Sequence, residues 1–578
     1  MLILPVEIMQ RARDRLAFLY GEPRAGRLLD RLALVAARHL DSLLPPTAPQ
    51  TRWDQTDVML ITYGDMVRRP DEPPLVTLRR FLDERVGDAI RDVHLLPIYP
   101  SSSDEGFSVI DYRRVDPLLG TWEDVHAIAL HRGLMLDLVL NHVSRHSEWF
   151  KDYVMGIAPA RHYFIEVSPE TDLSAVVRPR STPLLTPTQT RAGLRHVWTT
   201  FSEDQIDLNY ANPDVLFEFL DILLAYVRHG ARFIRLDAVG FLWKEIGTSC
   251  MHLPQTHAVV RLFRDLVDMV APEVCLITET NVPHEENVSY FGHGDEAHIV
   301  YQFSLPPLLL HALLTGNGRY LRAWAEQLAP PPAGCTFLNF TASHDGIGVR
   351  PLEGIVPGEE VERLVQAVRM RGGRVSMRSG PEGRQVPYEL NITWFDALGE
   401  PGVEPDERHL RRFLCSQALM LSLQGIPAVY FHNLVGTRND YARLERTGQA
   451  RAINRHRWDA DELLRRLDDP GTHHARVFGE MLHMLRVRRD QPAFHPDTPQ
   501  QVLDLPETCF GVRRESRPGG QCIDVVANLT DLPQQVCLDG VSGEDLLTGE
   551  AVREGAIELA PYQVRWIARP LTGQEEAS

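Results

Sequence analysis

The sequence has few of the features that mark secreted, membrane-spanning or nucleic-acid-binding proteins. Its seven cysteines are scattered without a CxxC pair, so neither a disulfide framework nor a metal cluster is expected. Arginines follow the N-terminal apolar residues too soon for a signal peptide, and no apolar run is long enough to span a membrane. The formal net charge of −18 argues against a general nucleic-acid binder. We therefore expect a cytoplasmic protein with no membrane or nucleic-acid partner.

A chain of 578 residues is too long for one ordinary domain, and its 44% hydrophobic and 24% charged residues are ordinary for a soluble globular protein. Residues 1–57 are predicted to form an N-terminal helical arm, with one amphipathic helix before Gly21 and one after it, followed by a Pro-rich connector at 44–49. From about residue 505 onward, short alternating runs separated by turn residues predict an all-β terminal domain.

The stretch 230–238 has the composition of a buried strand and ends in Arg235 and Asp237. Alternation places both side chains on one face of the strand, and a buried charge must be paired. Taken alone, the pair is explained equally well by a core salt bridge and by a carboxylate nucleophile that an arginine keeps ionised.

Three further apolar runs also end in polar or ionisable residues, namely Asn141-His142, Glu279 and His344-Asp345. Helix-like segments lie between these runs, which predicts an α/β protein with a (β/α)8 TIM barrel and its chemistry at the C-terminal ends of the strands. We assign residues 58–141, 208–345 and 400–495 to the barrel, 142–207 and 346–399 to irregular inserted domains B and B′, and 496–578 to a C-terminal β domain.

The carboxylates indicate the chemistry. Two acids that flank a glycosidic bond are the standard equipment for glycoside cleavage. Asp237, next to Arg235, is expected to be the ionised nucleophile, and Glu279, after an apolar run, the protonated general acid. Asp345 is expected to bind sugar hydroxyls. Together they predict double displacement with retention through a covalent glucosyl-Asp237.

These motifs, in this order, resemble the α-amylase family of glycoside hydrolases and more closely its sucrose phosphorylase branch. The closer resemblance rests on the stretches 60–65, 235–240, 305–312, 344–348 and 453–456. It implies that an α-glucoside is cleaved by inorganic phosphate, a co-substrate, to α-glucose 1-phosphate, with no cofactor and no metal, by a monomer or homodimer. Asn141 is then a sugar-binding or supporting residue, although amylases use an asparagine there near calcium.

The resemblance also implies which residues surround the carboxylates. The sugar would be bound by Asp104, Phe107, His142, Phe201, Arg235, Asn281, His344 and Arg451. Among these, Asp104 and Arg451 would hold the glucose 4-hydroxyl, and Phe107 would form an apolar platform. The acceptor or phosphate would be bound by Arg180, Tyr388 and Glu389.

Two departures bear on the acceptor. Members that act on sucrose itself carry a histidine where this chain has Asn281 and a glutamine where it has Glu389. The chain resembles instead the glucosylglycerate phosphorylases and the sucrose 6'-phosphate phosphorylases, whose acceptors are anionic. The four arginines between 371 and 384 form either a solvated loop face or an anion site.

We favour 2-O-α-D-glucosyl-D-glycerate as the substrate. Sucrose 6'-phosphate and sucrose stay open as substrates, and glycerol stays open as an acceptor. Two hypotheses from other functional classes also remain. The protein could be an ordinary α-glucoside hydrolase with water as the acceptor, or a non-catalytic binding protein.

Overall fold

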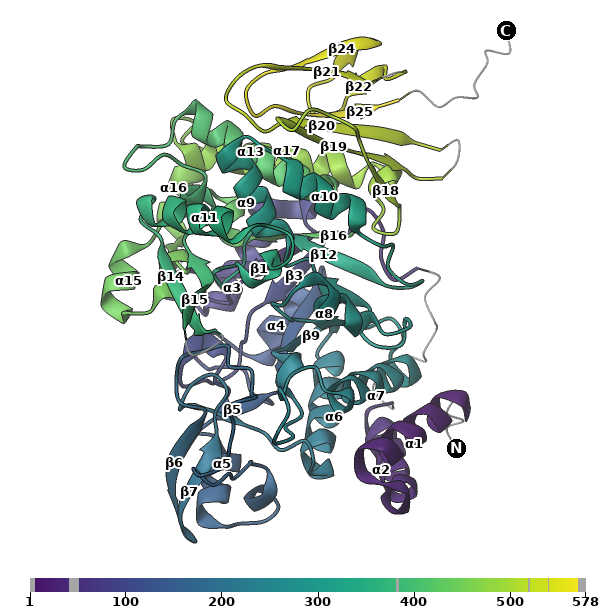
Figure 1. Ribbon diagram of the computed structural model, residues 1–578, viewed down its shortest axis with the longest axis vertical. Coiled ribbons are helices and arrows are strands. Elements are labelled where there is room, and N and C mark those ends of the chain that lie inside the picture. Colours follow the sequence, from purple (N-terminus) through teal and green to yellow (C-terminus); the bar gives the residue numbers. More distant parts are fainter. Residues whose placement is uncertain (1–5, 41–50, 381–383, 518–519, 539, 570–578) are drawn as a thin grey trace.

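Eight parallel strands close into a barrel in the computed structural model, which describes residues 6–40, 51–380, 384–517, 520–538 and 540–569 (Figure 1). In spatial order they are β1 (Met59–Thr62), β3 (Asp92–Leu95), β4 (Gly133–Val139), β9 (Ala231–Asp237), β10 (Cys275–Thr278), β11 (Ile299–Tyr301), β12 (Thr336–Phe340) and β16 (Ile426–Tyr430). Each pairs in parallel with its neighbours, and β16 pairs with β1 to complete the ring. The predicted (β/α)8 barrel is confirmed.

Helices connect the strands and cover the outside of the barrel: α3 (Pro74–Phe81), α4 (Trp122–Ala129), α6 (Pro213–Arg228), α7 (Pro254–Val270), α9 (Leu305–Thr315), α10 (Arg319–Gln327), α13 (Glu407–Ser422) and α17 (His473–Arg489). Helix α6 shows how the sequence sets such an element. Asn212 caps its first turn, Pro213 occupies the first helical position, and the helix ends just before Gly230. Gly230 has φ +96°, and an added Cβ would lie 2.8 Å from Ala129, so glycine is required where the chain turns into β9.

The helical segment that begins with α3 is not a single α-helix, because α3 itself ends at Phe81. A π-helical turn (Leu82–Val86) and a 3-10 turn (Gly87–Ala89) follow it.

The two insertions contain regular structure, so the expectation that they are irregular was wrong. In domain B, β5 (His142–Ser144) pairs with β8 (Gln205–Asp207), β6 (Leu185–Thr190) pairs with β7 (Gly193–Trp198), and α5 (Glu148–Met155) lies beside them. In B′, β13 (Ile347–Gly348), β14 (Arg374–Ser379) and β15 (Gln385–Asn391) form a sheet next to α11 (Gly358–Met370). Their strands are rich in polar residues, as in Leu-Thr-Pro-Thr-Gln-Thr of β6, and therefore lack the apolar alternation that marks a strand.

The N-terminal arm consists of α1 (Val6–Tyr20) and α2 (Glu22–Leu40), as predicted, and it packs beside α6 and α7 (Figure 1). Arg15 of α1 forms an ion pair with Asp265 of α7, which is almost completely buried. The predicted Pro-rich connector at 44–49 lies outside the described residues.

The C-terminal region is all β, as predicted. Its larger sheet has six strands in the order β18-β19-β20-β25-β22-β23, with β18 (Gln500–Val502), β19 (Cys509–Glu515), β20 (Cys522–Asn528), β25 (Val564–Ala568), β22 (Gly543–Asp545) and β23 (Glu550–Val552). A smaller sheet pairs β21 (Gln534–Leu538) with β24 (Gly555–Leu559). Across the described ranges, every helix is too short or too polar to cross a membrane.

Candidate active site

A buried charge cluster lies at the C-terminal ends of β4, β9 and β10. The strand register places Asp137 opposite Arg235 and Val139 opposite Asp237. Arg235 Nη1 donates to both Asp137 and Asp237, with 2.7 Å between Nη1 and Asp237 Oδ1. Asp137 also accepts from Nε2 of His94 at 2.6 Å. The salt bridge expected from strand alternation is therefore present, and it continues into a network beneath the floor of the pocket.

Asp237 and Glu279 share this arginine. Oε2 of Glu279 lies 4.0 Å from Arg235 Nη2 and accepts the backbone N–H of Ala238 at 3.2 Å. Burial raises the pKa of both carboxyls, and the repulsion between them raises the pKa of Asp237 further. Two such groups titrate as a pair that holds one proton. The closer guanidinium contact favours the charge on Asp237, which leaves the proton with Glu279.

Asp345 lines the same pocket and carries a different charge state. Burial by itself would raise the pKa of Asp345, but Arg451, His344 and Arg455 outweigh burial and hold this pKa well below its usual range. Arg451 Nη1 lies 2.6 Å from Asp345 Oδ1. Asp345 is therefore an ionised acceptor for hydrogen bonds, whereas Glu279 has a proton to donate.

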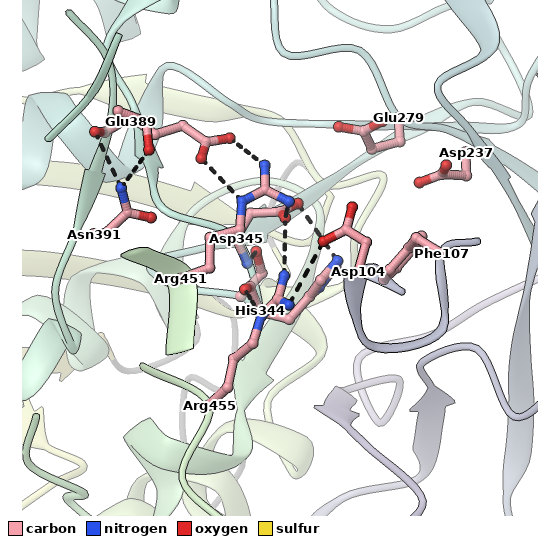
Figure 2. A network of polar contacts seen from close by, with 12 residues as sticks. Asp104, Phe107, Asp237, Glu279, His344, Asp345, Glu389, Asn391, Arg451 and Arg455 are labelled. Atoms are coloured by element: carbon pink, nitrogen blue, oxygen red, sulfur yellow. Dashed lines mark hydrogen bonds and ion pairs between the residues drawn. The ribbon is translucent and has the colours of Figure 1, made fainter. Parts of the chain in front are cut away.

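Arg451 joins Asp345 to the B′ insertion. Its Nη2 and Nε donate to the two carboxylate oxygens of Glu389 at 2.6 and 3.0 Å, which is a bidentate pair (Figure 2). Glu389 belongs to β15, so this contact holds the inserted sheet against the barrel. A glutamine at this position would not supply the negative charge that Arg451 meets here.

A second arginine, Arg455, lies below this pair (Figure 2). Its side chain is completely buried, and Nη1 and Nη2 lie 3.8 Å from Asp104 Oδ1 and Asp345 Oδ1 respectively. Neither nitrogen has a hydrogen-bond partner among the described residues. Arg455 is thus placed to hold the two carboxylates of Asp104 and Asp345, both of which line the pocket.

Two stacked rings form an aromatic wall of the pocket. The rings of Phe107 and His344 stack with centroids 4.8 Å apart and an interplanar angle of 3°. His142 donates from Nε2 to the carbonyl of Phe107 at 2.8 Å, which leaves Nδ1 as an acceptor. Burial lowers the pKa of both histidines, so they are neutral hydrogen-bonding groups.

Lys244 lies beside Asn141, the position at which amylases use an asparagine near calcium. Its Nζ lies 2.7 Å from Asn141 Oδ1 and 2.6 Å from Asp207 Oδ2, and it also donates to the carbonyl of Phe241. The side chains of Lys244 and Asp207 are 4% and 0% exposed. The oxygens of Asn141 and Asp207 therefore already face a built-in ammonium group and do not fit a further cation. Across the described ranges, we find no cluster of His, Cys, Asp or Glu side chains arranged to bind a metal ion.

The structure brings nearly all the predicted residues into one pocket. Its lining contains Asp104, Phe107, His142, Arg180, Phe201, Asp237, Glu279, Asn281, His344, Asp345, Tyr388, Glu389 and Arg451. Arg235, predicted to bind sugar, is absent from the lining of this pocket and 2% exposed, because its guanidinium is engaged by Asp137 and Asp237 beneath the floor.

Several residues of the pocket were missed from sequence. Among them are Gln205, Met251, Arg178 and Arg350. Of the four arginines between 371 and 384, Arg378 lines the pocket. Arg371 and Arg374 donate to backbone carbonyls elsewhere. The stretch 453–456 was recognised as a family marker, but nothing in its pattern shows that Arg455 meets Asp104.

Sequence comparison gives the relationship. The model of the α-amylase catalytic domain matches residues 89–319, and that of the C-terminal immunoglobulin-like domain of D-apionate lactonase matches 516–567. A glucosylglycerate phosphorylase from Allomeiothermus silvanus is 49% identical, over 98% of this chain and 99% of the relative. This chain belongs to the α-amylase family, in its branch of phosphorylases. A glucosylglycerate phosphorylase from Escherichia coli is 44% identical, over 96% and 100% of the two chains.

A solved structure agrees with this membership. The sucrose 6F-phosphate phosphorylase from Thermoanaerobacter thermosaccharolyticum superposes with a TM-score of 0.72 at 25% identity, covering 82% of this chain and 94% of that one. The predicted resemblance to the sucrose phosphorylase branch is thereby confirmed.

Proposed function

We propose that this protein is a retaining phosphorylase that cleaves 2-O-α-D-glucosyl-D-glycerate with inorganic phosphate to α-D-glucose 1-phosphate and D-glycerate. The observation that supports it most is the pairing of Asp237 and Glu279 on one guanidinium, in a chain 49% identical to a glucosylglycerate phosphorylase. Contact with a common arginine keeps the two carboxyls close, as the retaining mechanism requires.

In the first step, Asp237 attacks the anomeric carbon while Glu279 donates its proton to the glycosidic oxygen, and D-glycerate leaves. The electron pair of the broken glycosidic bond leaves with the D-glycerate oxygen, which takes the proton, and a lone pair of the Asp237 carboxylate forms the new ester bond to carbon 1. In the second step, Glu279 accepts a proton from phosphate as a phosphate oxygen displaces Asp237 and forms α-glucose 1-phosphate. The proton balance closes over the two steps, so Glu279 ends as it began.

The glucosyl group is proposed to lie against Phe107, with its hydroxyls on Asp104, His142, His344, Asp345 and Arg451. Phe201 would line the entrance, and Arg180, Tyr388 and Glu389 the acceptor side. Arg235 holds Asp237 ionised, which is a supporting role beneath the floor. The ammonium of Lys244 beside Asn141 and Asp207 supports a reaction that uses no metal and no cofactor.

The remaining proposals concern the whole molecule. We keep the domain limits at residues 57, 141, 207, 345, 399 and 495. All seven cysteines are free thiols, and Cys537 is exposed, which supports action in the reducing cytoplasm. We propose that the protein acts on small molecules alone, as a monomer or homodimer.

The test is phosphate release by the purified protein from α-glucose 1-phosphate, with D-glycerate, fructose 6-phosphate, D-fructose or glycerol as the acceptor. A strong preference for D-glycerate is expected. Preference for fructose 6-phosphate would replace the proposed acceptor. Release without an acceptor at a similar rate would make the protein a hydrolase.

A further inference from the structure

Arg350 lies in the pocket but has no role in the chemistry described so far. It is the first residue of a 3-10 turn (Arg350–Leu352) that follows β13. Its side chain is 15% exposed and lines the same pocket as Asp237 and Glu279.

The wall that carries Arg350 is the one beyond the general acid. Asn281 comes two residues after Glu279 and packs against Gly348, where an added Cβ would lie 2.4 Å from Asn281 Oδ1. Arg350 follows Gly348 by two residues. By contrast, Arg451 and Arg455 lie with Asp345 and Asp104 at the sugar end of the pocket. Glu279 protonates the oxygen between glucose and the acceptor, so an acceptor lies on the Arg350 side of it.

The contacts of Arg350 leave its charge only partly satisfied. Its Nη2 donates to Glu286 at 3.3 Å, and Nη1 faces the sulfur of Met251 at 3.9 Å. Glu286 is 41% exposed and is shared with His252 at 3.3 Å. The other pocket arginines with carboxylate partners are bound more tightly. Arg378 meets Glu353 at 2.6 Å, and Arg451 meets both Asp345 and Glu389 at 2.6 Å.

We infer that Arg350 is the specificity-determining residue that binds the carboxylate of the acceptor. This inference rests on the proposed function. In glucosylglycerate the carboxylate is bonded to the carbon that carries the glycosidic oxygen, so its partner must stand beside Glu279. A guanidinium suits this role because it binds a carboxylate through two parallel hydrogen bonds. Glu286 holds the guanidinium in place without saturating it, and Asn281, whose Oδ1 is buried without a partner, accepts from an acceptor hydroxyl.

The test compares acceptors that differ in charge. Both D-glycerate and glycerol capture the same glucosyl-enzyme formed from α-glucose 1-phosphate, and glycerol carries a hydroxymethyl group in place of the carboxylate. The ratio of their kcat/KM values therefore reports recognition of the carboxylate and cancels any effect on the first step. Acceptor-free hydrolysis of α-glucose 1-phosphate measures formation of the glucosyl-enzyme independently.

Arg350→Gln is expected to lower the glycerate-to-glycerol ratio about 10- to 100-fold, the usual cost of losing a hydrogen-bonded charge, while hydrolysis continues. Arg350→Lys should restore part of the ratio, because it keeps the charge but not the two-pronged geometry. The matched control is Arg438→Gln, which removes an arginine bound to Asp396 and Glu404 that does not line the pocket. It should leave the ratio unchanged.

Two results would overturn the inference in different ways. In the first, the unmodified protein uses glycerate, but Arg350→Gln keeps the glycerate-to-glycerol ratio, or Arg180→Gln or Arg378→Gln collapses this ratio instead. Another residue then binds the carboxylate, and the proposed function stands. If the unmodified protein does not prefer glycerate over glycerol, the proposed function fails and the inference falls with it.

Discussion

Lys244 offers a direct test of how the barrel and domain B are held together. Lys151 and Lys244 are the chain's only two lysines, and they differ in burial. Lys244→Met removes an ammonium bound by Asn141, Asp207 and Phe241 and leaves the carboxylate of Asp207 buried without the ion pair seen in the described part of the chain. Asp207 keeps hydrogen bonds from the backbone and hydroxyl of Thr200 at 2.7 and 2.6 Å.

Removing one partner of a buried ion pair costs about 3–5 kcal/mol. The matched control is Lys151→Met, which removes a surface pair with Glu148 whose side chains are 55% and 80% exposed, and such a pair contributes about 0–1 kcal/mol. Asn141 donates to Nδ1 of His142 at 3.3 Å. Loss of the Lys244 ammonium should therefore also displace His142, which is proposed to bind a sugar hydroxyl.

The assay is urea denaturation of both variants, followed by tryptophan fluorescence, together with phosphate release from α-glucose 1-phosphate. Lys244→Met should lower the free energy of the first unfolding transition by about 3–5 kcal/mol and reduce kcat/KM, whereas Lys151→Met should change neither appreciably. If the two variants differ by less than about 1 kcal/mol, the ammonium does not hold domain B, and the account of Asn141 and Asp207 is wrong.

Two further predictions concern the sugar end and the acid. Asp104 and Glu105 both have positive φ, +48° and +47°, and Glu105 is held at 2.9 Å by each of Arg443 and Arg457. Glu105 thereby fixes the turn that carries Asp104, the residue proposed to hold the glucose 4-hydroxyl. Glu105→Gln should therefore raise KM for α-glucose 1-phosphate several-fold but leave KM for the 4-deoxy analogue unaffected. Glu400→Gln, which removes a carboxylate that meets Arg412 and Arg371 away from the pocket, serves as control, and equal effects on both sugars would refute the prediction. Burial raises the pKa of Glu279, so activity should fall at alkaline pH as its proton is lost, and at acid pH as Asp237 gains one. Glu279→Gln should remove the alkaline limb of kcat/KM for a substrate with a good leaving group; a persistent limb would assign it to another residue.

Local sequence patterns were sufficient to predict the barrel and the three carboxylates at its strand ends. Each strand is an apolar run followed by polar residues, and parallel strands of a barrel end at the same edge. Asp237, Glu279 and Asp345 could therefore be placed in one pocket without any knowledge of distances. The insertions were harder to interpret, because β6 and β14 are rich in polar residues and only partly buried.

Other features depend on contacts between segments far apart in the sequence. Arg457 and Glu105 are separated by 352 positions, and Arg451 and Glu389 by 62, so no local pattern links them. Likewise, the sequence placed Arg235 and Asp237 on one face, whereas tertiary packing decided that Arg235 lies beneath the pocket.

The fold class, the family and the three carboxylates of the pocket could thus be predicted from the sequence, because these follow from local periodicity and conspicuous motifs. Which cation meets which carboxylate became clear from the three-dimensional packing. Ion pairing depends on where loops from different strands converge, and that is set by the closure of the barrel.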